Sequence, residues 1–101
     1  MRMIVFFDLP NDTYNHQKEY RKFRKLLIDE GFFMMQESVY TKLALNMSVV
    51  NSEKEKLDKV KPKDGIVQLL IVTEKQFSNI ETIVGEVNTE KLNSTDRLVI
   101  I

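Results

Sequence analysis

The chain has 101 residues, a length that suits one domain and not two. It has no cysteine and one histidine, which excludes a disulfide framework, a thiolate metal site and a zinc site built from several histidines of one chain. Its 15 basic and 15 acidic residues balance, so net charge alone does not indicate a nucleic-acid-binding protein. The N-terminus lacks the pattern of a signal peptide, and no apolar run approaches the roughly 20 residues that a membrane helix needs. We therefore expect a soluble, cytoplasmic protein with a single domain over residues 1–101.

The first strong pattern is an apolar run over residues 3–7, which a lone carboxylate, Asp8, follows. An apolar run without polar alternation predicts a strand buried on both faces. Asp8 would then lie at the rim of the core, where a charged group keeps contact with water. It could accept hydrogen bonds from the following turn or cap the next helix. The alternative is a metal-binding or catalytic acid.

Residues 15–30 have the pattern of an amphipathic helix. Tyr20, Phe23 and Leu27 recur at helical spacing and predict its buried stripe. His16 lies beside this stripe, which favours a core or interface histidine over a general base. Gly31 is a suitable residue to end the helix. Three polar residues could cap its start: Asp12, Thr13 and Asn15.

The opposite face of the same predicted helix is basic. Four cations have the spacing i, i+3, i+4, i+7 and form what we call the basic ridge: Lys18, Arg21, Lys22 and Lys25. Arg24 is a candidate fifth member, since it falls between the two faces and could reach either the ridge or the edge of the core. Two interpretations stay open, a solvated helix face and a surface that binds phosphates.

The middle of the chain predicts two further strands and a second helix. Residues 32–45 have strand composition with a polar interruption at residues 36–38, which predicts two strands joined by a bulge or tight bend. Residues 47–60 predict the second helix. Ser52 and Glu55 have capping-box spacing, which favours a later start for this helix.

The last third of the chain predicts several short elements. Residues 66–73 predict a second strand buried on both faces, because only Gln68 interrupts the apolar run. Residues 74–77 predict a short helical turn, residues 79–84 a strand, and residues 97–101 a final strand.

The order of these elements predicts the α+β class, as a ferredoxin-like βαββαβ sandwich with an extra C-terminal strand. Two helices cover only one face of a four-stranded sheet, whereas two predicted strands are apolar on both faces. We therefore expect a homodimer in which two sheets pack face to face about a two-fold axis. Such an axis could bring two Asp8 carboxylates together, and two carboxylates with several waters suit one Mg²⁺.

Five stretches form a series over nearly the whole chain. They are Phe7-Asp8-Leu9-Pro10, residues 20–27, Gly31-Phe32, residues 36–40, and Thr73-Glu74-Lys75-Gln76-Phe77. In order and spacing they resemble CRISPR-associated protein 2, the small partner of the CRISPR spacer integrase. The last stretch is similar to members from type II systems.

The resemblance implies a ferredoxin-like homodimer that binds one Mg²⁺ per dimer, shared by the Asp8 residues of the two chains. It also implies a metal-dependent endonuclease acting on RNA or DNA. In spacer acquisition, such a dimer bridges two dimers of the integrase, CRISPR-associated protein 1, around a short DNA duplex. Short strands over about residues 80–101 would complete the dimer, with residues 97–101 paired to the partner chain.

Phosphodiester hydrolysis would use a metal on Asp8 to activate a water. Three residues could support this site, although helix capping, the strand bend and packing explain them as well: Asp12, Ser38 and Tyr40. The basic ridge, with Arg24, could hold the backbone of double-stranded DNA or single-stranded RNA.

Two other function classes stay open. A toxin-type metal-dependent endoribonuclease would keep Asp8 and need no integrase. A small-molecule sensor could also use a ferredoxin-like dimer, although three glycines in the whole chain offer little material for a ligand loop.

Overall fold

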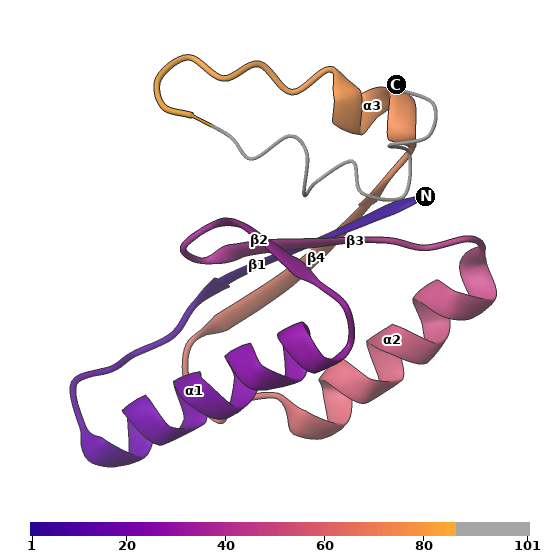
Figure 1. The fold of residues 1–101 in the computed structure, drawn as a ribbon. Helices are drawn as coiled ribbons and strands as arrows, with labels where there is room; N and C mark the ends of the chain where they lie inside the picture. Colours follow the sequence, from indigo (N-terminus) through magenta and orange to yellow (C-terminus); the bar gives the residue numbers. More distant parts are fainter. Residues whose placement is uncertain (87–101) are drawn as a thin grey trace.

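The computed structural model describes residues 1–86. Its elements, labelled in Figure 1, are β1 (Arg2–Asp8), α1 (Tyr14–Asp29), β2 (Phe33–Gln36), β3 (Val39–Leu43), α2 (Met47–Val60), β4 (Ile66–Val72) and α3 (Glu74–Ser78). The strand predicted at residues 97–101 lies outside the described residues.

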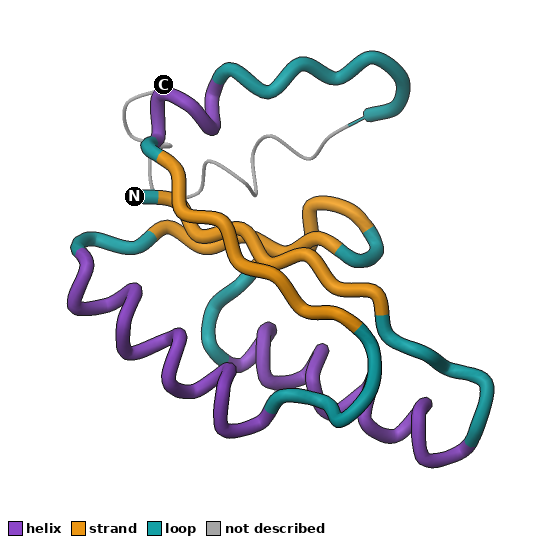
Figure 2. The backbone as a smooth tube through the Cα atoms, turned by 180° about the vertical axis from the view of Figure 1, so that it is seen from behind, coloured by secondary structure: helices purple, strands orange, loops and turns teal. Residues whose placement is uncertain are grey.

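The four strands form one antiparallel sheet in the order β2-β3-β1-β4. Helices α1 and α2 lie on one face of this sheet, and α3 lies on the other, as the two opposite views show (Figures 1 and 2). The element order and the strand order confirm the α+β class and the ferredoxin-like βαββαβ sandwich. Among residues 1–86, no helix combines the length and apolarity that crossing a membrane requires.

The main core lies between the sheet and the two long helices. Met3, Val5 and Phe7 of β1 point to this side and pack with Phe23 and Leu27 of α1. The rings of Phe7 and Phe23 meet edge to face, with centroids 5.4 Å apart. Each large apolar side chain buried here stabilises the fold by about 1.5–3 kcal/mol. The predicted stripe of α1 is therefore confirmed for Phe23 and Leu27.

Within residues 1–86, helix α3 covers one end of the second face of the sheet. Ile4 is buried there against Phe77 of α3, but Phe6 is 38% exposed and Leu70 is 48% exposed. Strand β4 is an edge strand, and its residues alternate between the core and the open face. One chain therefore buries β4 on one face, and burial of its second face stays a prediction that depends on a second copy.

Helix α3 is attached to the second face by a buried arginine. Arg2 is 1% exposed, and its guanidinium donates two hydrogen bonds to Glu74, of 2.8 and 3.0 Å. It also lies 4.2 Å from the centroid of the Phe77 ring. Thr73 begins α3 with a capping box. The helical turn predicted at residues 74–77 is confirmed.

Caps and turns explain where the other elements begin and end. Thr13, one of the three predicted caps, accepts a hydrogen bond from the His16 N–H at 3.1 Å and begins α1. Gly31 follows α1 with a φ of 91°, which suits a residue without Cβ. Strands β2 and β3 form a hairpin with a register shift between Met34 and Gln36, as the polar interruption predicted.

The helix predicted at residues 47–60 is confirmed, since α2 covers Met47–Val60. The later start that the spacing of Ser52 and Glu55 suggested is not observed, because the Asn46 side chain caps the helix by accepting from the Val49 N–H at 3.0 Å. Residues 79–84 contain no strand. The strand predicted there is therefore wrong, and no strand of residues 1–86 pairs with this segment, so β-prone composition alone did not make a strand.

Candidate metal centre and nucleic-acid interface

Asp8 ends β1 on the open side of the sheet. Side chains alternate along a strand, so Asp8 shares its face with Phe6, and it pairs in register with Ile66 of the edge strand β4. Asp8 is exposed, and within residues 1–86 its carboxylate takes part in no hydrogen bond or ion pair. It therefore caps no helix and binds no turn amide there, and its oxygens point to a surface where a ligand could reach them.

Gly65 brings a second loop against Asp8. This glycine ends the α2–β4 loop (residues 61–65) with a φ of +95°, and a Cβ built on it would lie 2.6 Å from the Asp8 carbonyl oxygen and 2.9 Å from the Leu9 side chain. Only a residue without a side chain fits so close to the backbone. The α2–β4 loop is thus in direct contact with the strand end that carries the carboxylate.

One described chain does not hold a complete metal site. No group of three or more His, Cys, Asp and Glu side chains among residues 1–86 is arranged to hold a metal ion. A carboxylate oxygen suits Mg²⁺, which keeps several waters and takes one or two carboxylates from the protein. The donor chemistry of Asp8 fits such an ion, and the small number of ligands fits a site shared between two copies.

The residues predicted to support Asp8 have other roles. Tyr40 is 1% exposed, lies on the helix side of the sheet, and packs its ring 5.6 Å from that of Phe7. Ser38 lies in the β2–β3 turn, where its carbonyl accepts the Phe7 N–H at 3.0 Å. Asp12 binds His16. Tyr40 is on the opposite face from Asp8, so its predicted support for the metal is wrong within one chain.

The basic ridge lies on the exposed side of α1. Lys18, Arg21, Lys22 and Lys25 are all exposed. Lys25 pairs with Asp29 one turn later, at 2.6 Å. Arg24, the candidate fifth member of the ridge, reaches toward the core, and its Nε donates to the buried Tyr40 hydroxyl at 2.9 Å. Arg24 therefore contacts the edge of the core, but it is exposed, and its membership of the phosphate-binding surface stays a prediction.

The position of His16 beside the apolar stripe predicted a core or interface histidine. Within this chain His16 does not lie in the core. Its side chain is 25% exposed and lies between two carboxylates. Nδ1 is 2.6 Å from Asp12 Oδ1, and Nε2 is 2.9 Å from Asp64 Oδ2, on the α2–β4 loop. Both ring nitrogens are therefore occupied, which disfavours a general base. The Asp12–His16 spacing of i, i+4 is visible in the sequence, but Asp64 is 48 residues further along the chain.

The hydrogen bonds to His16 change two pKa values. The bond to Asp12, followed by the bond to Asp64, raises the pKa of His16 above 6.5. The bond to His16 also lowers the pKa of Asp12 below 3.8. Both shifts favour the imidazolium form, in which each ring nitrogen donates to a carboxylate.

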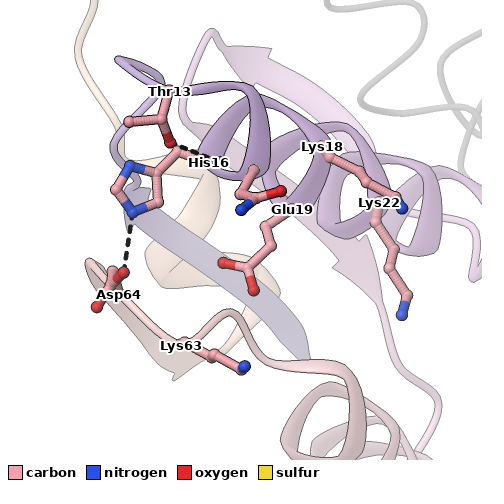
Figure 3. Close-up of a pocket in the computed structure, with 8 residues that line it drawn as sticks. Thr13, His16, Lys18, Glu19, Lys22, Lys63 and Asp64 are labelled. Carbon is pink, nitrogen blue, oxygen red and sulfur yellow. Dashed lines mark hydrogen bonds and ion pairs between the residues drawn. The ribbon is translucent and has the colours of Figure 1, made fainter.

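A hollow of about 580 Å³ lies between the start of α1 and the α2–β4 loop. Figure 3 shows the side chains that line it: Thr13, Asn15, His16, Lys18, Glu19, Lys22, Lys63 and Asp64. Lys63 thus joins two cations of the basic ridge, Lys18 and Lys22, around one surface. The sequence did not single out Lys63 for binding, because helix-terminal lysines commonly serve the helix dipole.

Known proteins resemble this chain along its whole length. The sequence model of a family described as CRISPR associated protein Cas2 matches residues 1–80. A protein of Treponema denticola is 50% identical over 101 residues, covering 100% of both chains. The chain belongs to the Cas2 family. This confirms the resemblance found in the five stretches.

Other members of the Cas2 family are similarly close. A protein of Streptococcus mutans is 50% identical over 101 residues, covering 100% of this chain and 93% of its own. A protein of Ligilactobacillus salivarius is 42% identical over 101 residues, covering 100% of both chains. These two proteins and that of Treponema denticola are each named CRISPR-associated endoribonuclease Cas2.

Solved Cas2 structures share the fold. The crystal structure of Streptococcus pyogenes Cas2 at pH 6.5 matches with a TM-score of 0.65 and 22% identity, over 83% of this chain and 100% of that one. A second crystal structure of Cas2 matches with a TM-score of 0.60 and 21% identity, over 88% of this chain and 91% of that one. The likeness supports the ferredoxin-like architecture of the sheet and helices.

Proposed function

We propose that the chain is a metal-dependent endoribonuclease of a CRISPR system that works as a homodimer. The names of three relatives at 42% to 50% identity support the nuclease activity. The structural observation that carries the proposal is Asp8, an exposed carboxylate at the rim of a partly open, apolar sheet face.

The surroundings of Asp8 support a second copy of the chain as the occupant of this face. Phe6 and Ile66, on the same face next to Asp8, are 38% and 57% exposed, and Leu70, opposite Ile4 further along this face, is 48% exposed. Helix α3 covers only the far end of the face, near Arg2 (Figure 1). A two-fold dimer would bury the same apolar patch of each copy, and each large side chain buried contributes about 1.5–3 kcal/mol.

In this dimer, Asp8 of each copy would bind one shared Mg²⁺. The ion would supply a water activated as nucleophile and would stabilise charge on the scissile phosphate. The chain's own contribution is a carboxylate on the end of a strand whose backbone is held by two neighbouring strands and by Gly65. The exposed cations of the basic ridge would hold backbone phosphates of RNA.

We also propose that the dimer acts in spacer acquisition, bridging two dimers of the integrase, CRISPR-associated protein 1, around a DNA duplex. The basic ridge on α1 lies on the helix side of the sheet, opposite the Asp8 face (Figure 2). A sheet-to-sheet dimer would therefore present its two ridges on outer surfaces. The net charge of zero predicts weak DNA binding by the chain alone, so a basic partner would add the remaining contacts.

The test compares the wild type with Asp8→Asn, a variant of the same size without the charge. We expect Mg²⁺-dependent cleavage of single-stranded RNA to fall by about 100-fold or more, since the metal would lose its protein ligands. Duplex DNA is assayed in parallel, and sedimentation shows whether the variant still dimerises. Equal cleavage by a dimeric Asp8→Asn variant would refute the nuclease site.

Spacer integration, measured with the integrase present, separates the two proposed activities. Integration that survives in Asp8→Asn while cleavage is lost would show that bridging does not need the metal. If the wild type cleaves RNA and spacer integration proceeds equally well without this chain, the chain instead acts as a toxin-type endoribonuclease without an integrase.

A further inference from the structure

The Asp12–His16–Asp64 bridge joins the two loops that flank Asp8. Asp12 belongs to the β1–α1 loop (residues 9–13), which leaves Asp8 directly, and His16 lies in the first turn of α1. Asp64 belongs to the α2–β4 loop and precedes Gly65, and a Cβ built on Gly65 would lie 2.6 Å from the Asp8 carbonyl oxygen. One imidazole therefore connects two segments that are distant in sequence and that both contact the carboxylate-bearing strand end.

The bridge is suited to holding these loops and unsuited to binding a metal. Its two carboxylates bind opposite nitrogens of the ring, so no single point is close to all three side chains, and residues 1–86 contain no three-residue metal group. A neutral imidazole has one N–H and could donate to only one carboxylate. The protonated ring donates to both, through charge-assisted hydrogen bonds.

We propose that His16 is a positioning residue for Asp8, which fixes the β1–α1 and α2–β4 loops around the strand end through its bonds to Asp12 and Asp64. This inference rests on the proposed nuclease function. Displacing a metal-binding carboxylate by a fraction of an ångström lowers activity because the ligand geometry is lost. His16 itself touches neither the metal nor the substrate in this account.

The position of the bridge predicts a dependence on pH. The charged groups around His16 are Asp12 on the β1–α1 loop, Lys18, Glu19 and Lys22 on α1, and Lys63 and Asp64 on the α2–β4 loop. The pKa of His16 is raised by its two carboxylates, so the imidazolium is fully present below 6.5. It is lost as pH rises through the raised value, and one of the two bonds is lost with it.

The experiment measures the ratio of RNA cleavage rates, wild type over His16→Gln, across pH. A glutamine has one donor group and cannot reach both carboxylates. We expect a ratio of about tenfold at pH 6.5, the size typical for residues that orient a metal ligand. The ratio should fall toward one as pH rises, because the wild type then loses half of its bridge. Dividing the two rates removes the pH dependence of the hydrolysis itself.

Two further variants give the experiment its controls. His16→Arg carries a permanent charge and several donors, so it should restore cleavage and make the ratio independent of pH. Lys56→Gln breaks an ion pair of comparable exposure, to Glu30 at 2.9 Å, that lies outside the two loops around Asp8, and it should leave cleavage unchanged at every pH.

Amide chemical shifts of Asp8 and Leu9 provide a readout that needs no activity. They should move in His16→Gln and Asp64→Asn, and return in His16→Arg. If His16→Gln lowers thermal stability while these shifts and the cleavage rate stay unchanged, the bridge only stabilises the fold and the inference is wrong. If wild type and Asp8→Asn cleave equally, the proposed nuclease fails instead, and the amide shifts alone decide whether His16 positions the strand end.

Discussion

At Gly65 a single backbone position lets the α2–β4 loop approach the backbone of Asp8. In the sequence this glycine only follows the predicted second helix (residues 47–60), and nothing there indicates which backbone atoms approach it. The structure places it against the Asp8 carbonyl oxygen. Asp8 itself was predictable from its own neighbours, since an apolar run that stops at a carboxylate places that carboxylate at the rim of the core.

Replacing Gly65 with alanine should move Asp8 and destabilise the fold. The left-handed φ alone costs an L-residue about 1–2 kcal/mol, and a Cβ at 2.6 Å from a backbone oxygen adds a clash that a rigid strand relieves only by shifting. Urea unfolding should therefore show a larger loss of stability than φ strain explains, together with reduced Mg²⁺-dependent cleavage.

Gly31→Ala is the matched control for this substitution. Gly31 has nearly the same φ, +91°, but the nearest atoms to its Cβ belong to the Lys42 side chain, at 3.8 Å and beyond. It should show the φ penalty alone and retain cleavage. Equal effects of the two substitutions on stability and activity would mean that the approach of Gly65 to Asp8 has no consequence.

The elements that sequence patterns predicted best are those with a strong apolar period. Phe23 and Leu27 identified α1, and the apolar run of β1 was correct for the strand itself. Failures came where a local pattern competed with tertiary structure. Asn46 caps α2, so the capping-box spacing of Ser52 and Glu55 has no effect. His16 was expected in the core or at an interface because the period of its neighbours is visible in sequence, whereas Asp64 is brought to it only by folding.

Helix α3 is short and depends on one buried ion pair for its position. Removing one partner of a fully buried pair costs about 3–5 kcal/mol, and since Glu74 is 38% exposed we expect Glu74→Gln to cost about 1–2 kcal/mol. Hydrogen exchange should become faster in α3 and near Ile4, which packs on Phe77. Asp58→Asn, which breaks an exposed ion pair, should leave hydrogen exchange unchanged both in α3 and near Ile4. Unchanged exchange in Glu74→Gln would show that Arg2 holds α3 without this pair.

The whole molecule separates two surfaces, an apolar sheet face with Asp8 and a helix layer with the basic ridge. The residue pattern predicted the apolar sheet face and the basic ridge. It also predicted that a second copy of the chain covers the sheet face. It could not predict that α3 covers one end of the sheet face, because that depends on a contact between Arg2 and Glu74, 72 residues apart. This partial cover limits a second copy to the end of the face that carries Asp8.

The basic ridge should control the salt dependence of nucleic-acid binding. In a triple variant, Lys18→Glu, Arg21→Glu and Lys22→Glu, we expect weaker binding of the integrase–chain complex to duplex DNA. The salt slope should become shallower by about 0.9 for each phosphate that the protein no longer neutralises. Spacer acquisition should be abolished in cells.

The control for this triple variant makes the same change in net charge at exposed positions elsewhere, namely Lys54→Glu, Lys59→Glu and Lys75→Glu. If both triple variants weaken binding equally, net charge and not the ridge determines affinity.

The stoichiometry of Mg²⁺ binding tests the shared Asp8 site most directly. Calorimetric titration of the wild type, with its oligomeric state measured by sedimentation in the same buffer, should give one ion for two chains, and Asp8→Asn should bind none at that site while remaining dimeric. One ion per chain, or binding unchanged in Asp8→Asn, would contradict a metal centre built from two copies of Asp8.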